Sequence, residues 1–235
     1  MSRLAATLGL DARLQARNRV YWIVTGVAVA LALALRALFT PDQLRFFMPV
    51  LALSGVSITA FFLVGVLLML ERGEGTLDVV LVSPLRPAEY LASKLFSVTS
   101  LALGEALIVT GVGYGAGFQV SWLVLGVLLR AGLTAAVGVA LAVRYRGLTD
   151  FLLPAIAFSM AFDLPLLWYL EVWPAAGLAL WPTWPSLLLA KAAFTPVDTL
   201  HLAYACGYGA LALGAAVFWA LRAIDRYVVR GGQRP

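Results

Sequence analysis

Six long apolar runs dominate this sequence and limit the folds that it can adopt. They cover residues 20–39, 46–70, 94–116, 121–143, 150–170 and 201–222. A helix needs about 20 mostly apolar residues to cross a bilayer, and each run is that long. Only 12% of the residues are charged, whereas a soluble domain has about 25%. We therefore predict an all-α polytopic membrane protein with six transmembrane helices, forming a single transmembrane domain over residues 1–235.

The basic residues predict which way the chain is inserted. Alternate connections, together with both ends of the chain, hold thirteen of the 17 Lys and Arg residues: Arg3, Arg13, Arg17, Arg19, Arg72, Arg86, Lys94, Arg144, Arg146, Arg222, Arg226, Arg230 and Arg234. The opposite connections hold three: Arg36, Arg45 and Lys191. Cytoplasmic loops carry the excess of Lys and Arg, so both termini are predicted to be cytoplasmic, in a bacterial inner membrane. Because the net charge of +5 comes from these clusters, it does not indicate a nucleic-acid partner.

Two further segments are predicted to touch the bilayer without crossing it. Residues 1–19 are expected to form an interfacial helix, with leucines on the lipid side and arginines toward water. Within the outer segment 171–200, the apolar stretch 186–194 is too short to span, and prolines flank it. We expect short re-entrant helices there, before the sixth span.

The connection over residues 71–93 contains the most informative pattern in the chain. Ser83-Pro84 should end one short helix. Pro87 suits the first turn of the next helix, with Glu89 near its positive end. The pattern predicts a bent helical lever beneath the membrane, with four charged side chains available for docking to a cytoplasmic partner: Glu71, Arg72, Glu74 and Arg86.

The motif in this lever resembles that of ABC-2 type permeases, the membrane subunits of ATP-binding-cassette exporters. It reads Glu71…Gly75-Thr76-Leu77…Ser83-Pro84-Leu85-Arg86…Glu89-Tyr90-Leu91…Lys94. Within that class the chain is most similar to the small fluoroquinolone-export permeases, through Pro182-Thr183, Leu187-Leu188-Leu189 and Arg226-Tyr227-Val228-Val229. The resemblance implies that the lever docks on an ATPase subunit through Glu71, Gly75, Thr76, Leu77, Ser83, Pro84, Leu85 and Arg86.

The resemblance also implies a dimer of permeases, formed with an identical copy or a sister permease, that exports an apolar or amphipathic small molecule. The chain has no phosphate-binding loop, because Ser93 and Ala190 precede its only lysines, Lys94 and Lys191. We expect no cofactor and no enzymatic activity in this chain, with ATP and Mg bound by the partner ATPase. Alternative cargoes are haem, as in the haem-exporter B-type permeases of cytochrome maturation, or a lipid or glycan.

An intramembrane enzyme is the more distant alternative. A zinc protease needs a His-Glu-x-x-His motif, which is absent. His201 is the only histidine and Cys206 the only cysteine. The sequence therefore predicts no metal site.

Three charged residues fall inside predicted spans: Glu105, Arg130 and Asp163. Such residues are costly in lipid and usually face the protein interior or a cavity. Glu105 lies about 17 Å from one membrane face and Arg130 about 14 Å from the other, on consecutive antiparallel helices. We hypothesise a Glu105–Arg130 ion pair on this depth match. Asp163 precedes Leu164-Pro165, where a kink is expected, and could compete for Arg130 or face a cavity. Structural and functional roles both stay open for these carboxylates.

The resemblance further implies a substrate path between the second and fifth spans of two permeases. Aromatic and methionine side chains adapt to apolar substrates of varied shape. The candidates in these two spans are Phe61, Phe62, Phe158, Met160 and Phe162. Ordinary packing against lipid or neighbouring helices is the alternative role for all five.

Overall fold

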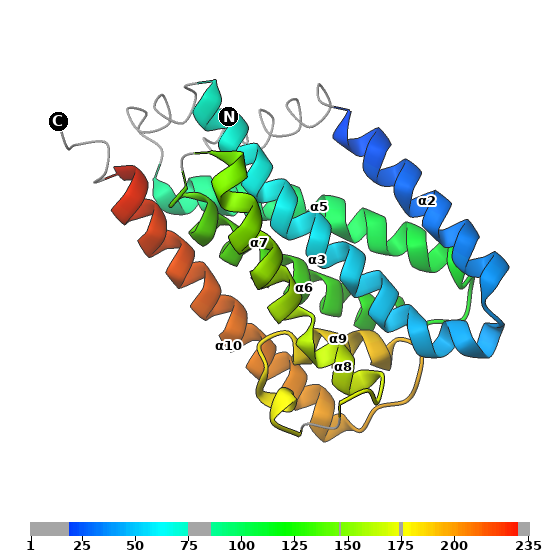
Figure 1. Cartoon of the computed structure of the whole chain (residues 1–235). Coiled ribbons are helices and arrows are strands. Elements are labelled where there is room, and N and C mark those ends of the chain that lie inside the picture. Colours follow the sequence, from blue (N-terminus) through cyan, green and yellow to red (C-terminus); the bar gives the residue numbers. More distant parts are fainter. Residues whose placement is uncertain (1–18, 75–85, 146, 174–175, 230–235) are drawn as a thin grey trace.

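The chain folds as a bundle of membrane-length helices in the computed structural model (Figure 1). The structure describes residues 19–74, 86–145, 147–173 and 176–229. Within them, six segments are long and apolar enough to cross a membrane. Four are the single helices α2 (Val20–Leu38), α3 (Pro41–Gly73), α5 (Pro87–Gly113) and α6 (Val120–Ala142). Another combines α7 (Leu148–Phe162) with α8 (Leu164–Tyr169), and the last begins with α10 (Thr199–Ile224) and continues to Val228. These helices match the six predicted runs, so the predicted fold class is confirmed.

Helix α3 is longer than the predicted span 46–70, because its start is polar. The Thr40 side chain accepts a hydrogen bond from the Gln43 backbone at 3.5 Å, and Gln43 Oε1 accepts one from the Thr40 backbone at 2.9 Å. This reciprocal capping starts the helix at Pro41. With 33 residues, α3 is about 50 Å long, and it therefore extends beyond a hydrocarbon core of about 30 Å.

The break in the predicted fifth span lies at the expected position. Helix α7 ends at Phe162 and α8 begins at Leu164, with Asp163 between them. Pro165 in the first turn of α8 lacks a backbone N–H and cannot continue the hydrogen bonding of α7. The predicted kink is confirmed.

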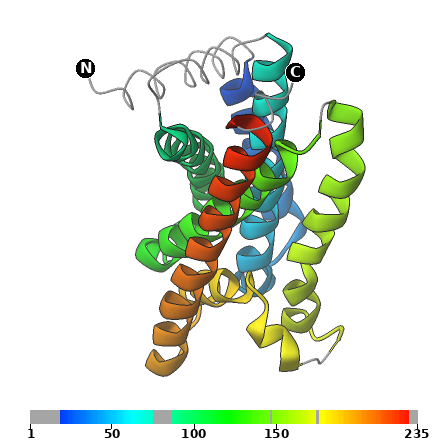
Figure 2. The same cartoon turned by 90° about the vertical axis from the view of Figure 1, so that its left-hand side faces the viewer.

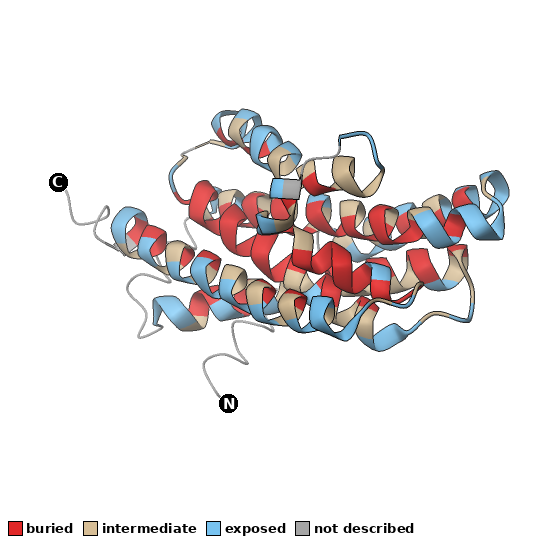
Figure 3. Cartoon of the chain, turned by 90° about the horizontal axis from the view of Figure 1, so that it is seen from below, coloured by how far each residue is buried: buried red, intermediate tan, exposed pale blue. Residues whose placement is uncertain are grey.

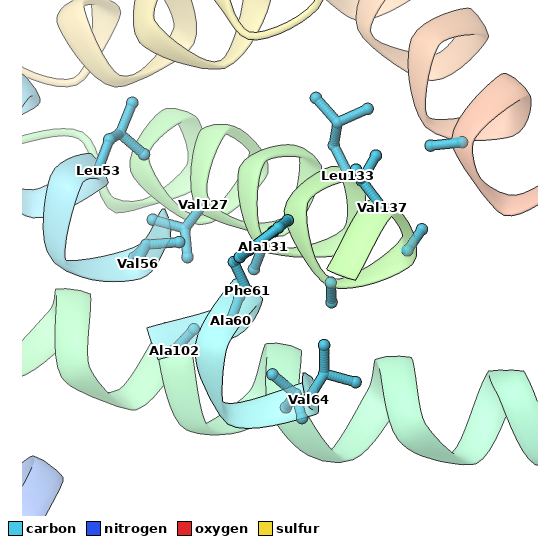
Figure 4. Close-up of a cluster of buried hydrophobic side chains, with 14 of the residues drawn as sticks. Leu53, Val56, Ala60, Phe61, Val64, Ala102, Val127, Ala131, Leu133 and Val137 are labelled. Atoms are coloured by element: carbon cyan, nitrogen blue, oxygen red, sulfur yellow. The ribbon is translucent and has the colours of Figure 1, made fainter. Parts of the chain in front are cut away.

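Helix α6 forms the centre of the bundle. Of its apolar window, 78% is buried, compared with 17% for α2 and for α10. Figure 3 shows the buried residues gathered in the middle of the bundle and the exposed residues along its outer sides. Residues of α6 interleave with those of α3 in the core, among them Val127, Ala131, Phe61 and Val64 (Figure 4). A Cβ on Gly138 would lie 2.7 Å from Val64 Cγ1 and 2.9 Å from the Phe61 carbonyl, so this glycine lets the two helices approach closely.

Helix α7 stands at the edge of the bundle (Figure 2). Its outward side chains are strongly exposed, with fractions of 77% for Leu153, 49% for Ile156 and 70% for Met160. Only Phe151 and Ala155 are buried on its inner side. The fifth span is therefore attached to the rest of the molecule along one narrow face.

The segment before the last span forms η1 (Ala176–Leu180) and α9 (Trp184–Ala192). With nine residues, α9 is about 14 Å long and cannot span a bilayer. It is buried against α6, where a Cβ on Gly126 would lie 2.8 Å from the Ser186 carbonyl. A short helix in this segment is therefore confirmed, and its re-entrant placement stays a prediction. The predicted interfacial helix lies outside the described residues, apart from Arg19.

The ends of the helices group on two sides of the bundle. The start of α2, the end of α3, the start of α5 and the end of α10 lie on one side, and η1 and α9 lie on the other (Figures 1 and 2). The short helix η2 (Asp225–Val229) follows α10 on the first side. The end of α3 and the start of α5 therefore share a side with both ends of the described chain, as the basic residues predict.

Candidate functional site

The predicted coupling segment leaves α3 and returns to α5. Six of its predicted residues lie outside the described residues: Gly75, Thr76, Leu77, Ser83, Pro84 and Leu85. Glu71 and Arg86 are described and flank the connection. Arg86 is exposed and precedes α5, where its backbone N–H donates to Glu89 Oε2 at 2.9 Å. The predicted helix start at Pro87 is thus confirmed.

A buried polar cluster ties the end of α3 to the first turns of α5. Glu71 forms a salt bridge with Lys94 and accepts a hydrogen bond of 2.6 Å from the Tyr90 hydroxyl. Lys94 is 2% exposed and Glu71 is 5% exposed. The prediction that Glu71 offers an exposed docking charge is therefore wrong, since its carboxylate holds two helices together. Tyr90 and Lys94 are four residues apart on α5 and so share a face, a signal that could have identified them.

Arg72 ties the same end of α3 to the end of α6. Its guanidinium donates hydrogen bonds to the backbone carbonyls of Tyr145 and Val143, the latter at 3.3 Å. These carbonyls lie just after α6, where a helix leaves backbone acceptors without intrahelical partners. A displacement of the 75–85 connection would therefore act directly on α3, α5 and α6.

Arg130 forms an ion pair with Asp163 inside the helix bundle. Its Nη2 contacts Asp163 Oδ1, and its Nε donates to Ser57 Oγ at 2.5 Å. Arg130 is 2% exposed, whereas the Asp163 side chain is 28% exposed. The cluster joins α3, α6 and the α7–α8 break. The hypothesis of a Glu105–Arg130 pair is wrong, because equal depth does not make two side chains point toward each other.

Glu105 lies on a different side of the bundle, between α5 and its neighbours α2 and α3. A Cβ on Gly55 would lie 2.8 Å from Glu105 Oε1, so α3 leaves room for the carboxylate at this glycine. Glu105 Oε2 is buried and has no hydrogen-bond partner. Glu105 also lines a cavity of about 260 Å³ between α2 and α5.

The five predicted substrate-path residues fall into three environments. Phe61 is 1% exposed and packs with Phe62 and Phe162, at ring-centroid distances of 5.7 and 6.1 Å. Phe158 is exposed, and its ring centroid lies 6.5 Å from that of Phe162. Met160 points outward from the bundle, with 70% of its surface exposed. Phe61 is therefore a core residue within this chain, and the five side chains do not line one common cavity.

A second and larger cavity of about 480 Å³ lies between α6 and α10, at the end of α7. Its lining is almost wholly apolar: Leu133, Val137, Phe162, Pro182, Tyr208, Leu211, Ala212, Ala215, Ala216 and Trp219. Only Phe162 belongs to the predicted set. The alanines of α10 recur three and four residues apart and leave space on one helix face, a spacing that the sequence prediction did not use.

Side-chain hydrogen bonds attach the outer segment to this region. Thr183 donates to the Phe162 carbonyl at 2.6 Å, and Tyr208 donates to the Leu180 carbonyl at 2.5 Å. The rings of Trp168 and Trp184 stack with centroids 4.2 Å apart. The outer segment therefore covers the end of the cavity next to the α7–α8 break. Among the described residues, no three His, Cys, Asp or Glu side chains gather as a metal site.

Comparison with known proteins gives one consistent result. A family model, described as the Fluoroquinolones export permease protein family, matches residues 2–232. Two fluoroquinolones export permease proteins, from two strains of Mycobacterium tuberculosis, are each 31% identical to this chain over 242 residues. Each alignment covers 98% of this chain and 98% of the relative.

Proposed function

Because this chain belongs to the fluoroquinolones export permease family, we propose that it is the membrane subunit of an ATP-driven exporter of apolar or amphipathic drugs. ATP and Mg bind to a separate ATP-binding-cassette ATPase subunit. A second permease, an identical copy or a sister chain, completes the assembly. The complex lies in a bacterial inner membrane, with both termini of this chain cytoplasmic.

The attachment of the coupling segment is the observation that carries this proposal. Residues 75–85 connect two helices that the Glu71–Lys94 salt bridge locks together. Arg72 adds the end of α6 to the same unit. An ATPase that grips this connection can therefore move three helices at once. A solvated loop of no function would not need a buried ion pair at its base, which is expensive to desolvate.

A chain of polar contacts leads from these helices to the larger cavity. Helices α3 and α6 supply Ser57 and Arg130, and Arg130 holds Asp163 at the α7–α8 break. Phe162, the neighbour of Asp163, lines the cavity. Movement of α3 against α6 would change the position of Asp163 and with it the wall of the cavity. This route supports a mechanism in which ATP-driven helix movement alters the access of substrate to the cavity.

The cavity favours a flat, apolar cargo. Ligand sites for drug-sized molecules usually enclose about 300–1,000 Å³, and this cavity of about 480 Å³ lies in that range. Phe162, Tyr208 and Trp219 supply aromatic surfaces on which a planar ring system can stack. The names of the relatives indicate fluoroquinolones, and we propose that aromatic drugs of this size are the cargo here. No feature of the described residues favours haem, lipid or glycan instead.

The test is ATP-dependent drug uptake into inverted membrane vesicles. The permease is expressed with its native genomic neighbours, purified through a tag on this chain, and examined for a co-eluting ATPase. Vesicles containing the complex should accumulate a fluorescent fluoroquinolone when ATP is present. Vesicles with a phosphate-loop lysine variant of the ATPase provide the control. Uptake without an ATPase would refute ATP coupling, and ATP-driven transport that excludes fluoroquinolones would refute the cargo.

A further inference from the structure

The cavity between α2 and α5 differs from the larger one in its chemistry. It is lined by Tyr21, Val24, Thr25, Ser97, Ser100, Leu101, Gly104, Glu105 and Ile108. Four of these residues carry hydroxyl groups and one carries a carboxylate. None of the described lining residues is a lysine or arginine. The cavity therefore combines a mainly apolar wall with hydroxyl groups and one carboxylate, inside a helix pair of membrane length.

Glu105 lacks a positively charged partner among the described residues. It is 9% exposed, and its carboxylate accepts a hydrogen bond from the Thr59 side chain, whereas its Oε2 has no hydrogen-bond partner. Arg130 is paired with Asp163 and is therefore not available to neutralise Glu105. A carboxylate in a membrane span is costly unless a positive charge or a proton neutralises it. A positively charged ligand in the cavity would provide that neutralisation.

The geometry points to a positively charged organic group as the ligand. We propose that the cavity between α2 and α5 binds the ammonium group of an amphipathic amine, with Glu105 as its anionic anchor. The hydroxyl groups of Thr25 and Ser100 lie in the same lining and can accept hydrogen bonds from the ammonium N–H groups. A divalent metal would need several further oxygen ligands, and one carboxylate serves a monovalent cation better.

The size and position of the cavity fit the charged end of such a molecule. At about 260 Å³ the cavity is smaller than a site for a whole drug. Only 17% of the apolar window of α2 is buried, so the outer flank of this helix pair is apolar and exposed in this chain. An amphipathic amine dissolved in the bilayer can insert its ammonium group between α2 and α5 and leave its apolar part in lipid. This inference rests on the proposed function at one point only, namely that such an amine is a substrate of the exporter.

Direct binding to the purified permease, without the ATPase, tests this site. The probe is dansylcadaverine, a fluorescent primary amine, and its N-acetylated analogue provides an uncharged control of nearly the same shape. The amine should bind to the wild-type chain, and the acetylated analogue should bind at least tenfold more weakly. Replacing Glu105→Gln removes the charge and should weaken amine binding roughly tenfold or more, as expected for the loss of a charged hydrogen bond.

A steric variant tests whether amine binding depends on the open cavity rather than on the stability of the fold. A Cβ on Gly104 or on Gly111 would meet no atom within 4 Å, so a leucine at either position should be tolerated. Gly104 lines the cavity, whereas Gly111 is on the same helix outside the lining. Gly104→Leu should abolish amine binding with Glu105 intact, and Gly111→Leu should leave it unchanged.

Two results would overturn the site. One is equal binding of the amine to wild-type and Glu105→Gln protein. The other is the absence of amine binding to folded wild-type protein. Because binding is measured on the permease alone, either result leaves the vesicle transport test unaffected. Failure of ATP-driven export would likewise leave a measured amine site in place.

Discussion

The buried Arg130–Asp163 pair should show a strongly asymmetric response to mutation. Asp163→Leu leaves a guanidinium that is 2% exposed without its counter-ion. Removing one partner of a buried pair in this way costs about 3–5 kcal/mol. Arg130→Met instead leaves a carboxylate that is 28% exposed and therefore less fully enclosed by the protein. That change should cost less, about 1–3 kcal/mol.

The double variant provides the sharper test of the same reasoning. Replacing both members with apolar residues removes the uncompensated charge, so its cost should be about 0–1 kcal/mol. The double variant should therefore be more stable than Asp163→Leu alone, with a large coupling free energy. Unfolding in mixed micelles with increasing dodecyl sulfate, followed by tryptophan fluorescence, measures the free energy of unfolding for all four proteins.

Two outcomes would refute this reasoning. Additive effects of the single substitutions would show that the two side chains do not interact in the membrane. A larger cost for Arg130→Met than for Asp163→Leu would show that Asp163 is the more strongly buried partner. Either result would also remove the proposed link between α6 and the α7–α8 break.

Three further predictions concern coupling, packing and the larger cavity. Arg86→Asp should uncouple ATP hydrolysis from transport without changing insertion; normal vesicle uptake by this variant would place the docking site elsewhere. Gly138→Leu should destabilise the chain by about 3 kcal/mol or more, because the new side chain would collide with α3. Gly207→Leu should leave the unfolding midpoint unchanged, because a Cβ at Gly207 would meet no atom within 4 Å. Ala216→Phe should fill the larger cavity and reduce drug uptake several-fold, whereas the same change at the exposed Ala210 should not reduce it. Equal uptake by both variants would argue against this cavity as the drug site.

The sequence predicted the helices well because hydropathy acts locally. An apolar run of about 20 residues can satisfy its backbone in lipid only as a helix, so the six runs became six helical spans. Proline signals were equally local: Pro87 begins α5, and Pro165 follows the break at Asp163. Polar helix ends were missed, as at Pro41 in α3, because a capped polar turn resembles a loop when only hydropathy is considered.

The site was predicted less completely, because side-chain direction depends on several helices at once. The motif of the connection between α3 and α5 predicted a coupling segment there, but it could not show that Glu71 is buried against Lys94. The aromatic candidates were chosen by residue type, and the structure brings only Phe162 to the larger cavity. Tyr208 and Trp219 of α10 complete that lining, and no feature of the sequence had linked them to the fifth span.

By itself, the sequence predicted the six membrane-length segments, the approximate depth of each charged residue within them, and the family that the coupling motif resembles. Only the tertiary structure decided that Arg130 pairs with Asp163 and that Glu105 lines a separate cavity. Depth along a helix follows from residue number, since each residue adds about 1.5 Å. The direction of a side chain around the helix axis has meaning only relative to neighbouring helices, and their packing depends on the small and large residues of the whole bundle.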